Sequence, residues 1–283
     1  MQKRKLGYTA LPNTENSIAL IKKNKRPTED RQSQRKHAYG RDSEMPQQLD
    51  NRIMSKQKRY ILQENDLPKQ WYNILADMPN KPLPPLNPAT KKAVSVDDLA
   101  HIFAKACAEQ ELDTQNAWID IPEEVQEKYK YYRSTPLVRA YALEEALQTP
   151  AHIYFKNESV NPLGSHKVNS AIPQCYYCKQ EGVTNVTTET GAGQWGAALS
   201  YAASVYGLSA AVYQVKISMQ QKPYRSLVMR TFGAAVTGSP SMSTRAGKNI
   251  ITRDPMHQGS LGTAISEAVE LATTTPNCKY TLV

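Results

Sequence analysis

The sequence predicts an α/β fold built around a doubly wound, mostly parallel sheet. Between residues 153 and 283, short strand-like segments alternate with helical segments, which is the pattern of βαβ units. One of these strands runs directly into a turn that begins with three small residues, 191–193, and opens a helix. The 283 residues are 40% hydrophobic and 22% charged, so collagen-like, coiled-coil and wholly disordered chains are excluded.

The positive charge is concentrated at the start of the chain. Of the formal net charge of +9, residues 1–60 contribute 15 basic against 6 acidic residues, which leaves the remainder neutral. We expect residues 1–53 to be a basic, disordered extension, because they are too polar to bury a core. Residues 54–135 are predicted to form an N-terminal arm with helices, and residues 136–283 the α/β region.

The composition also bears on compartment and on metals. No stretch approaches the ~18 consecutive apolar residues of a membrane span, and the N-terminus lacks the apolar core of a secretory signal. We therefore expect a cytoplasmic protein that does not bind a membrane. Nucleic acid is not expected as a partner either, because the basic run at 22–26 has the acidic neighbours Glu29 and Asp30 and no interleaved aromatic residues. The four cysteines are too few for a disulfide framework. Cys175 and Cys178 have the spacing of a zinc or redox pair but lie within a predicted helix, so they are interpreted as core residues and no metal site is expected.

The elements follow in order along the chain. Ser95 is predicted to cap a helix that continues to about residue 111, with Asp97 and Asp98 in its first turn. A strand is expected at 153–156. The last strand, 279–283, would be an edge that no later element covers. The elements between them are a helix at 167–181, a strand at 183–188, a helix at 194–206, a strand at 210–215, a helix at 222–232, a strand at 234–237 and a helix at 261–271.

The first segment with chemical potential is Asn-Pro-Leu-Gly-Ser-His-Lys-Val-Asn, residues 161–169. Its turn delivers Lys167 to a helix N-terminus, where free backbone N–H groups attract anions. A partly buried lysine in that positive field loses its proton more easily, as an amine that attacks a carbonyl must. A solvated lysine at the start of a helix explains this segment equally well.

The second segment is Thr-Thr-Glu-Thr-Gly-Ala-Gly-Gln-Trp-Gly, residues 187–196, between a strand and a helix. Small residues there let backbone N–H groups converge on an anion, and Glu189 beside them suggests a general acid or base. The spacing of the three glycines fits a dinucleotide fingerprint, but the acidic residue expected about 20 positions later is missing. A purely structural turn remains the alternative interpretation.

Together with Gln-Lys-Pro-Tyr-Arg at 221–225 and the Gly-Ser-Leu-Gly segment that begins at residue 259, these motifs resemble the tryptophan synthase beta family. The resemblance is strongest to its second, stand-alone subtype, in which the carboxylate loop has tryptophan where the common subtype has histidine. It extends from about Met54 to Val283.

The resemblance implies a pyridoxal-phosphate enzyme of fold type II. Lys167 would hold the cofactor as a Schiff base, with His166 and Asn169 beside it near the phosphate. Glu189 would be the catalytic acid and base, and Ser260 is similar to a hydroxyl residue that helps to bind the phosphate. The substrate carboxylate would be held by Thr190, Gly191, Ala192, Gly193, Gln194 and Trp195, of which Gln194 would also contact the cofactor.

The reaction implied is a β-replacement, in which L-serine or a related amino acid and indole give L-tryptophan. In the family, the glycine-rich phosphate cup lies in the second half of the chain, and that half is absent from this sequence. We therefore expect a truncated form that acts only if a separately encoded C-terminal half or a continuation of the chain completes the site, in a family whose full-length members form homodimers. The alternative is a catalytically inert fragment or an interaction module.

Overall fold

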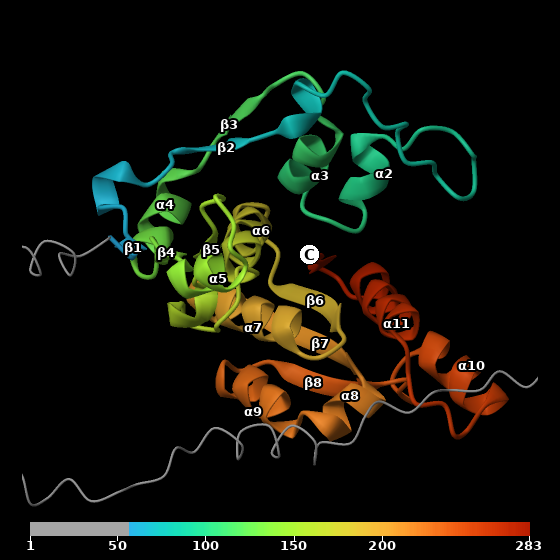
Figure 1. The fold of residues 1–283 in the computed structure, drawn as a ribbon. Helices are drawn as coiled ribbons and strands as arrows, with labels where there is room; N and C mark the ends of the chain where they lie inside the picture. Colours follow the sequence, from blue (N-terminus) through green and yellow to red (C-terminus); the bar gives the residue numbers. More distant parts are fainter. Residues whose placement is uncertain (1–56) are drawn as a thin grey trace, which may run out of the picture. The chain divides into compact units, whose positions relative to one another are not determined.

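A four-stranded parallel sheet forms the centre of the α/β region (Figure 1). The computed structural model describes residues 57–283, so the predicted disorder of residues 1–53 lies outside the described residues. The strand order is β8-β7-β6-β9, and every neighbouring pair is parallel. The strands are β6 (Asn185–Thr190), β7 (Ser209–Val215), β8 (Ala235–Ser239) and β9 (Cys278–Tyr280).

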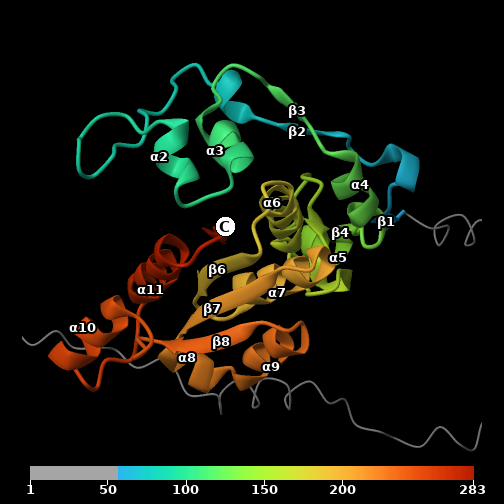
Figure 2. The ribbon, with the colours of Figure 1, turned by 180° about the vertical axis from the view of Figure 1, so that it is seen from behind.

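Helices cover both faces of this sheet, which confirms the predicted doubly wound arrangement. Successive residues of a strand point to opposite faces. On β7, Val212 packs in the core cluster that contains residues of α6 (Val168–Gln180) and α7 (Gln194–Tyr206), whereas Tyr213 packs in the cluster that contains residues of α11 (Leu261–Thr274). Helices α6 and α7 therefore lie on one face and α11 on the other (Figures 1 and 2).

The predicted helix from Ser95 to about residue 111 is two helices, so that prediction is corrected. Ser95 does cap α2 (Val96–Ala100), in a capping box with Asp98. The chain then turns, and α3 (Lys105–Leu112) begins after Ala104. The turn places Ile102 and Phe103 against the cluster around α11, and the Ile102 carbonyl accepts a hydrogen bond from Tyr280 N at 2.8 Å. Burial of these two side chains against β9 outweighs the continuation of one helix.

The strand predicted at 153–156 belongs to a separate antiparallel sheet. That sheet consists of β1 (Arg59–Tyr60), β4 (Leu137–Arg139) and β5 (Tyr154–Lys156) in the order β1-β4-β5. Glu144 stabilises the connection between β4 and β5. Its carboxylate forms a salt bridge with Arg139 at 3.0 Å and accepts a hydrogen bond from Ile153 N at 2.7 Å. These contacts reverse the chain over a short distance, so β5 returns beside β4.

The edge strand β9 has more partners than the sequence suggests. Its inner side pairs with β6, and on its outer side Tyr280 N bonds to Ile102 O. Beyond the strand, the side-chain amide of Gln174 bonds both backbone groups of Leu282, donating to its oxygen at 2.8 Å and accepting from its nitrogen at 3.1 Å. Elements that precede β9 in the chain therefore satisfy part of the edge that the sequence predicts to be uncovered.

The remaining elements lie around these sheets. Cys175 and Cys178 are free and buried in the core, as predicted. Among the helices of residues 57–283, none combines the length and the hydropathy that crossing a membrane requires. The helices α8 and α10 do not correspond to any predicted element. The elements not yet given are β2 (Gln70–Tyr72), β3 (Trp118–Asp120), α4 (Glu123–Lys130), α5 (Tyr141–Ala146), α8 (Lys216–Gln221), α9 (Pro223–Thr231) and α10 (Arg245–Arg253).

Candidate active site

The two predicted motifs lie at the same edge of the parallel sheet. Helix α6 ends just before β6 begins and packs beside α7, which begins just after β6 ends. The 13 residues of α6 and the 6 residues of β6 each span about 20 Å, at ~1.5 and ~3.3 Å per residue. An antiparallel return over equal lengths brings Lys167, at the start of α6, to the carboxyl end of β6. This is the edge at which open α/β sheets bind ligands.

Asn161 organises the loop that precedes Lys167. Its Oδ1 accepts hydrogen bonds from Leu163 N at 3.0 Å and Ser165 N at 3.2 Å, and its Nδ2 donates to Ser165 O at 2.9 Å. The loop ends at Lys167, the N-cap residue of α6, whose side chain is half-buried and makes no capping bond. The amine is thus delivered by a fixed loop and is not used to close the helix.

His166 and Asn169 lie on either side of Lys167 but in different surroundings. His166 is exposed. Asn169 is half-buried in the first turn of α6, where its backbone oxygen accepts a hydrogen bond from the Tyr129 hydroxyl at 2.5 Å. The Asn169 Oδ1 atom is buried without a hydrogen-bond partner among residues 57–283. It can therefore bind a further polar group beside the amine.

Glu189 is a buried carboxylate near the end of β6. Its side chain is 4% exposed and lies on the α11 face of the sheet, opposite Tyr213 of β7. The Tyr280 hydroxyl donates a hydrogen bond to Glu189 Oε2, and Thr188 Oγ1 lies 3.4 Å from the same atom. Burial, then the hydrogen bond and charge of Glu189, raise the pKa of Tyr280, so the phenol stays protonated as the donor.

The turn after Glu189 leaves part of a helix N-terminus open. Thr190 Oγ1 accepts a hydrogen bond from Gly196 N in the first turn of α7 at 3.2 Å, whereas the N-cap residue, Gly193, has no side chain that could cap the other N–H groups. Gly193 adopts a φ of 97°, and a Cβ there would lie 2.6 Å from Arg225 Cβ. Glycine is therefore required for both the left-handed backbone and the close approach of Arg225. Uncapped N–H groups at such a terminus bind carboxylates and phosphates.

Side chains of the predicted carboxylate turn point in different directions. Trp195 is 3% exposed, and its indole nitrogen donates to Thr188 Oγ1 at 2.7 Å, so its side chain lies in the core. Ala192 and Gln194 are exposed, whereas Gly191 is half-buried. For Trp195, only the backbone is available to a ligand.

Ser260 lies at the same edge of the sheet. It is the N-cap of α11, and Leu261 beside it lies 3.9 Å from the position of a Cβ on Gly191. Ser260 forms a capping box with Thr263, in which the Ser260 hydroxyl accepts a hydrogen bond from Thr263 N at 3.2 Å. The structure thus brings Ser260 near the turn but uses its oxygen to cap a helix.

These residues fit pyridoxal phosphate in their chemistry. The cofactor has an aldehyde, for which Lys167 offers an amine, and a phosphate, for which uncapped helix termini offer donors. The unpartnered Asn169 Oδ1 adds a polar atom that no described residue satisfies. No metal-ligating cluster of histidine, cysteine and acidic residues occurs in the described part of the chain.

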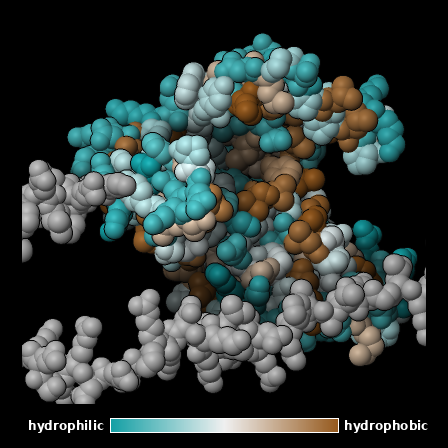
Figure 3. Space-filling model, viewed as in Figure 1, coloured by the Kyte–Doolittle hydropathy of each residue, from teal (hydrophilic) through white to brown (hydrophobic). Residues whose placement is uncertain are grey.

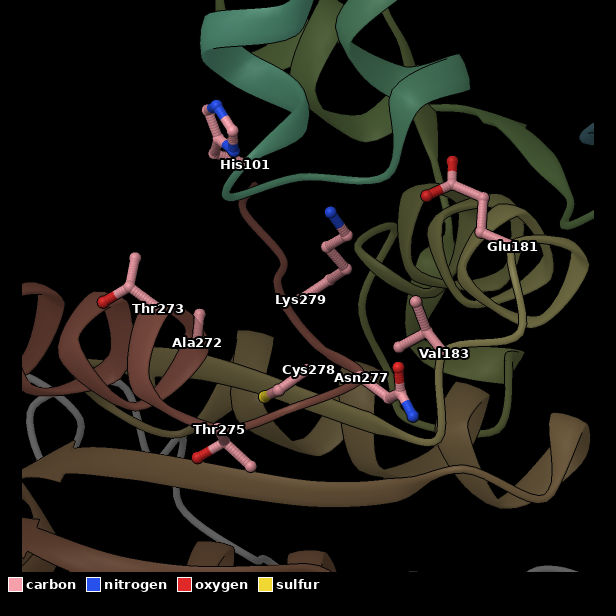
Figure 4. A pocket seen from close by; sticks show the side chains of 9 residues that line it. All are labelled: His101, Glu181, Val183, Ala272, Thr273, Thr275, Asn277, Cys278 and Lys279. Carbon is pink, nitrogen blue, oxygen red and sulfur yellow. The ribbon is translucent and has the colours of Figure 1, made fainter.

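An open pocket of about 580 Å³ lies away from Lys167 and Glu189 (Figure 4). Its lining includes Glu181, Val183 and Asn277, which lie at the end of α6 and just before β6 and β9. It is therefore at the opposite edge of the sheet from Lys167.

In the space-filling view, apolar residues gather in a hollow on one face, between the α2–α3 region and α11 (Figure 3).

Sequence reasoning missed two residues that contact Glu189. The sequence predicts a strand around Tyr280, but it specifies neither the pairing partner of that strand nor its register. Thr188 is part of the motif but receives no role from the sequence, although it accepts a hydrogen bond from the Trp195 indole nitrogen and donates one to Thr281 O, both at 2.7 Å. The signal for Tyr280 is weak, because its contact with Glu189 depends on the parallel pairing of β6 with β9, about 90 residues later.

Comparison with known proteins supports the interpretation of these motifs. Residues 129–281, more than half of the chain, match the family described as pyridoxal-phosphate dependent enzyme. The chain is 54% identical over 221 residues to tryptophan synthase beta chain 2 of Thermotoga maritima, covering 78% of this chain and 52% of that protein. It is 49% identical over 230 residues to tryptophan synthase beta chain 2 of Methanosarcina acetivorans, covering 81% and 52%.

A third relative, the tryptophan synthase beta chain of Pyrococcus horikoshii, is 48% identical over 223 residues, which cover 78% of this chain and 48% of that protein. The chain thus spans about half the length of the curated relatives it matches. The family match covers Lys167, Glu189 and the turn that follows Glu189, together with the whole parallel sheet. The chain belongs to the family of pyridoxal-phosphate dependent enzymes.

Proposed function

We propose that this chain forms part of a pyridoxal-phosphate site for β-replacement, in which L-serine and indole give L-tryptophan. The observation that carries the proposal is the position of Lys167, Glu189 and the turn 190–195 at one edge of the parallel sheet. The names of the relatives at about 50% identity support the choice of reaction. The enzyme would work in the cytoplasm, and homodimer formation belongs to the same proposal.

Lys167, His166 and Asn169 would bind the cofactor. The Lys167 amine would hold the cofactor covalently, and His166 and Asn169 would contact it near the phosphate. Gln194 and Ser260 would also contact the cofactor. When bound, pyridoxal phosphate withdraws electrons from the α-carbon of an amino acid. The turn 190–195 would orient the substrate by binding its carboxylate through backbone N–H groups at the start of α7.

Glu189 would move protons at the substrate. Its carboxyl would give a proton to the departing serine hydroxyl and, as a carboxylate, then accept one from indole. Its low exposure keeps water away from this exchange. The other wall of the site, including the glycine-rich phosphate cup, would be supplied by a separate C-terminal polypeptide or by a continuation of the chain.

Cofactor binding is the direct test. Purified protein with pyridoxal phosphate should develop the visible absorbance of the bound cofactor, and borohydride reduction followed by peptide mapping should place the label on Lys167. Lys167→Ala should abolish both signals. Lys179→Ala, which changes an exposed lysine in the last turn of the same helix, should preserve them.

The contrary results are equally distinct. A label on another lysine, or equal absorbance for Lys167→Ala and Lys179→Ala, would refute the assignment of the amine. Absence of any bound cofactor, with and without a C-terminal half from a relative added to the mixture, would favour the inert fragment.

A further inference from the structure

A buried tyrosine holds one oxygen of the proposed catalytic carboxylate. Tyr280 is 3% exposed, and its hydroxyl donates to Glu189 Oε2 across the β6–β9 pair. The two residues are 91 positions apart in the chain. Their contact exists only because β9 pairs with β6 in the register that places Tyr280 opposite Thr187.

Tyr280 is fixed in place independently of Glu189. Its backbone nitrogen donates to Ile102 O at 2.8 Å, and its ring centroid lies 5.6 Å from that of Phe103 in a tilted arrangement. The next residue, Thr281, donates its backbone N–H to Thr187 O at 2.9 Å. The phenol therefore presents its hydroxyl from a rigid position, so its hydrogen bond restricts the Glu189 side chain.

The two oxygens of Glu189 have different surroundings. Oε2 is held by Tyr280, with Thr188 at 3.4 Å. Oε1 accepts no hydrogen bond from any residue in 57–283 and is not among the fully buried unpartnered atoms of that part of the chain, so a small part of its surface stays accessible although Glu189 is only 4% exposed. Burial and the neighbouring carboxylate raise the pKa of Tyr280 and keep its phenol a donor at neutral pH.

We propose that Tyr280 is a positioning residue that holds Glu189 Oε2 and leaves Oε1 as the atom that gives and takes the proton. This inference rests on the proposed function of Glu189 and adds the residue that orients it. Tyr280 acts through Glu189 and need not touch the substrate. A displaced acid or base transfers protons poorly even where the substrate binds well.

The test compares Tyr280→Phe with Tyr213→Phe. Both variants remove a buried phenolic oxygen on the α11 face. Tyr213 is the neighbour of Glu189 across β6 and β7, but its phenol bonds to Ser243 and forms no hydrogen bond with Glu189. In the cofactor-loaded chain, assayed together with the C-terminal half of a relative, Tyr280→Phe should lower kcat by up to about 100-fold with little change in KM, and should shift the pH profile of kcat. Tyr213→Phe should keep the wild-type kcat and pH profile. Equal behaviour of the two variants would overturn the inference.

A second measurement does not require cofactor or turnover. In apo-protein with carbon-13 at the tyrosine Cζ atoms, the signal missing from Tyr280→Phe identifies Tyr280. That signal should titrate only above the usual tyrosine value of ~10, because burial and Glu189 raise the pKa of Tyr280, and it should titrate at lower pH in Glu189→Gln. An unchanged titration in Glu189→Gln would overturn the contact.

The two readouts separate the inference from the proposed function. Loss of cofactor binding in the wild-type chain, read from absorbance, refutes the proposed function whatever the tyrosine signal does. Wild-type cofactor binding with no difference between Tyr280→Phe and Tyr213→Phe refutes only the role of Tyr280. Cofactor binding retained in Tyr280→Phe, with a lowered kcat and a shifted pH profile, supports both.

Discussion

The indole nitrogen of Trp195 donates a hydrogen bond to the hydroxyl of Thr188 at 2.7 Å, across the base of the turn between β6 and α7. The Thr188 hydroxyl in turn donates to Thr281 O at 2.7 Å. One buried oxygen thus links helix α7, strand β6 and the chain that follows β9. The turn that is proposed to bind the substrate carboxylate is anchored through a side chain that faces away from it.

Replacement of Thr188 by valine should destabilise the fold. The change preserves shape but leaves the Trp195 N–H and the Thr281 oxygen without a partner in the core, which costs about 1–3 kcal/mol. Chemical denaturation monitored by Trp fluorescence and by circular dichroism would measure the loss.

The matched control is the neighbouring residue. Thr187 is also 0% exposed, but its hydroxyl has no partner among the described residues. Thr187→Val should therefore leave the free energy of unfolding unchanged or slightly higher, because a buried unpaired hydroxyl is removed. Equal losses in the two variants would contradict the role given to the Thr188 bond.

A methyl group at Gly196 should disrupt the contact of α7 with the sheet. A Cβ there would lie 2.6 Å from Met229 Sδ, 2.8 Å from Val212 Cγ1 and 2.9 Å from Thr190 Cγ2. Gly196→Ala should cost about 1–3 kcal/mol from overpacking, measured by thermal unfolding. Gly262→Ala, near the start of α11, meets nothing closer than 3.9 Å and should be neutral or stabilising by up to about 1 kcal/mol. A stable Gly196→Ala variant would show that α7 can move away from the sheet.

The local parts of the fold were predictable from the sequence. The helix at 194–206 was predicted with the bounds of α7, because a small-residue turn precedes it and Gly207, in the left-handed conformation, ends it. Ser95 as a helix cap follows from an equally local pattern. Each of these features is determined by residues close together in the chain.

Features that depend on distant residues were not predictable. The break at Ile102 results from its contacts with the cluster around α11 and β9, and those residues follow about 160 to 180 positions later. The contact of Glu189 with Tyr280 depends on the register of β6 with β9, which no local pattern specifies. For the same reason, Lys167 and the turn 190–195 could be identified separately, but their common sheet edge required the topology.

Stability should fall as the pH rises above about 9. Burial raises the pKa of Cys278 to about 11 and that of Cys107 to about 12, and it raises the pKa values of Cys175 and Cys178 further. In the unfolded chain these thiols ionise near pH ~8.5. Because the pKa values of these thiols are higher in the folded state, their contribution to the free energy of unfolding is complete below pH 8. It is lost as the pH rises, since unfolding then releases their protons.

The slope gives the measurement. Each thiol that ionises only on unfolding lowers the free energy of unfolding by up to about 1.4 kcal/mol per pH unit. Denaturant curves at pH 7, 8, 9 and 10 should show this decline, and calorimetry in buffers of different ionisation enthalpy should detect proton release on unfolding at alkaline pH. A flat profile between pH 8 and 10 would mean that the thiols are accessible in the folded state.

Removal of the Gln174 amide should loosen the chain after β9 without affecting the rest of the sheet. Gln174 bonds both backbone groups of Leu282, so it acts as a further strand partner at this edge. Gln174→Ala should speed amide hydrogen exchange at Leu282 by roughly tenfold, the equivalent of ~1.4 kcal/mol in local opening. Gln180→Ala, which changes an exposed residue of the same helix, should leave this rate unchanged. Tyr280 lies two residues before Leu282, so the two amides distinguish two outcomes. Faster exchange confined to Leu282 would show that β9 is held by β6 and Ile102. Faster exchange at Tyr280 as well would show that Gln174 supports the strand that orients Glu189.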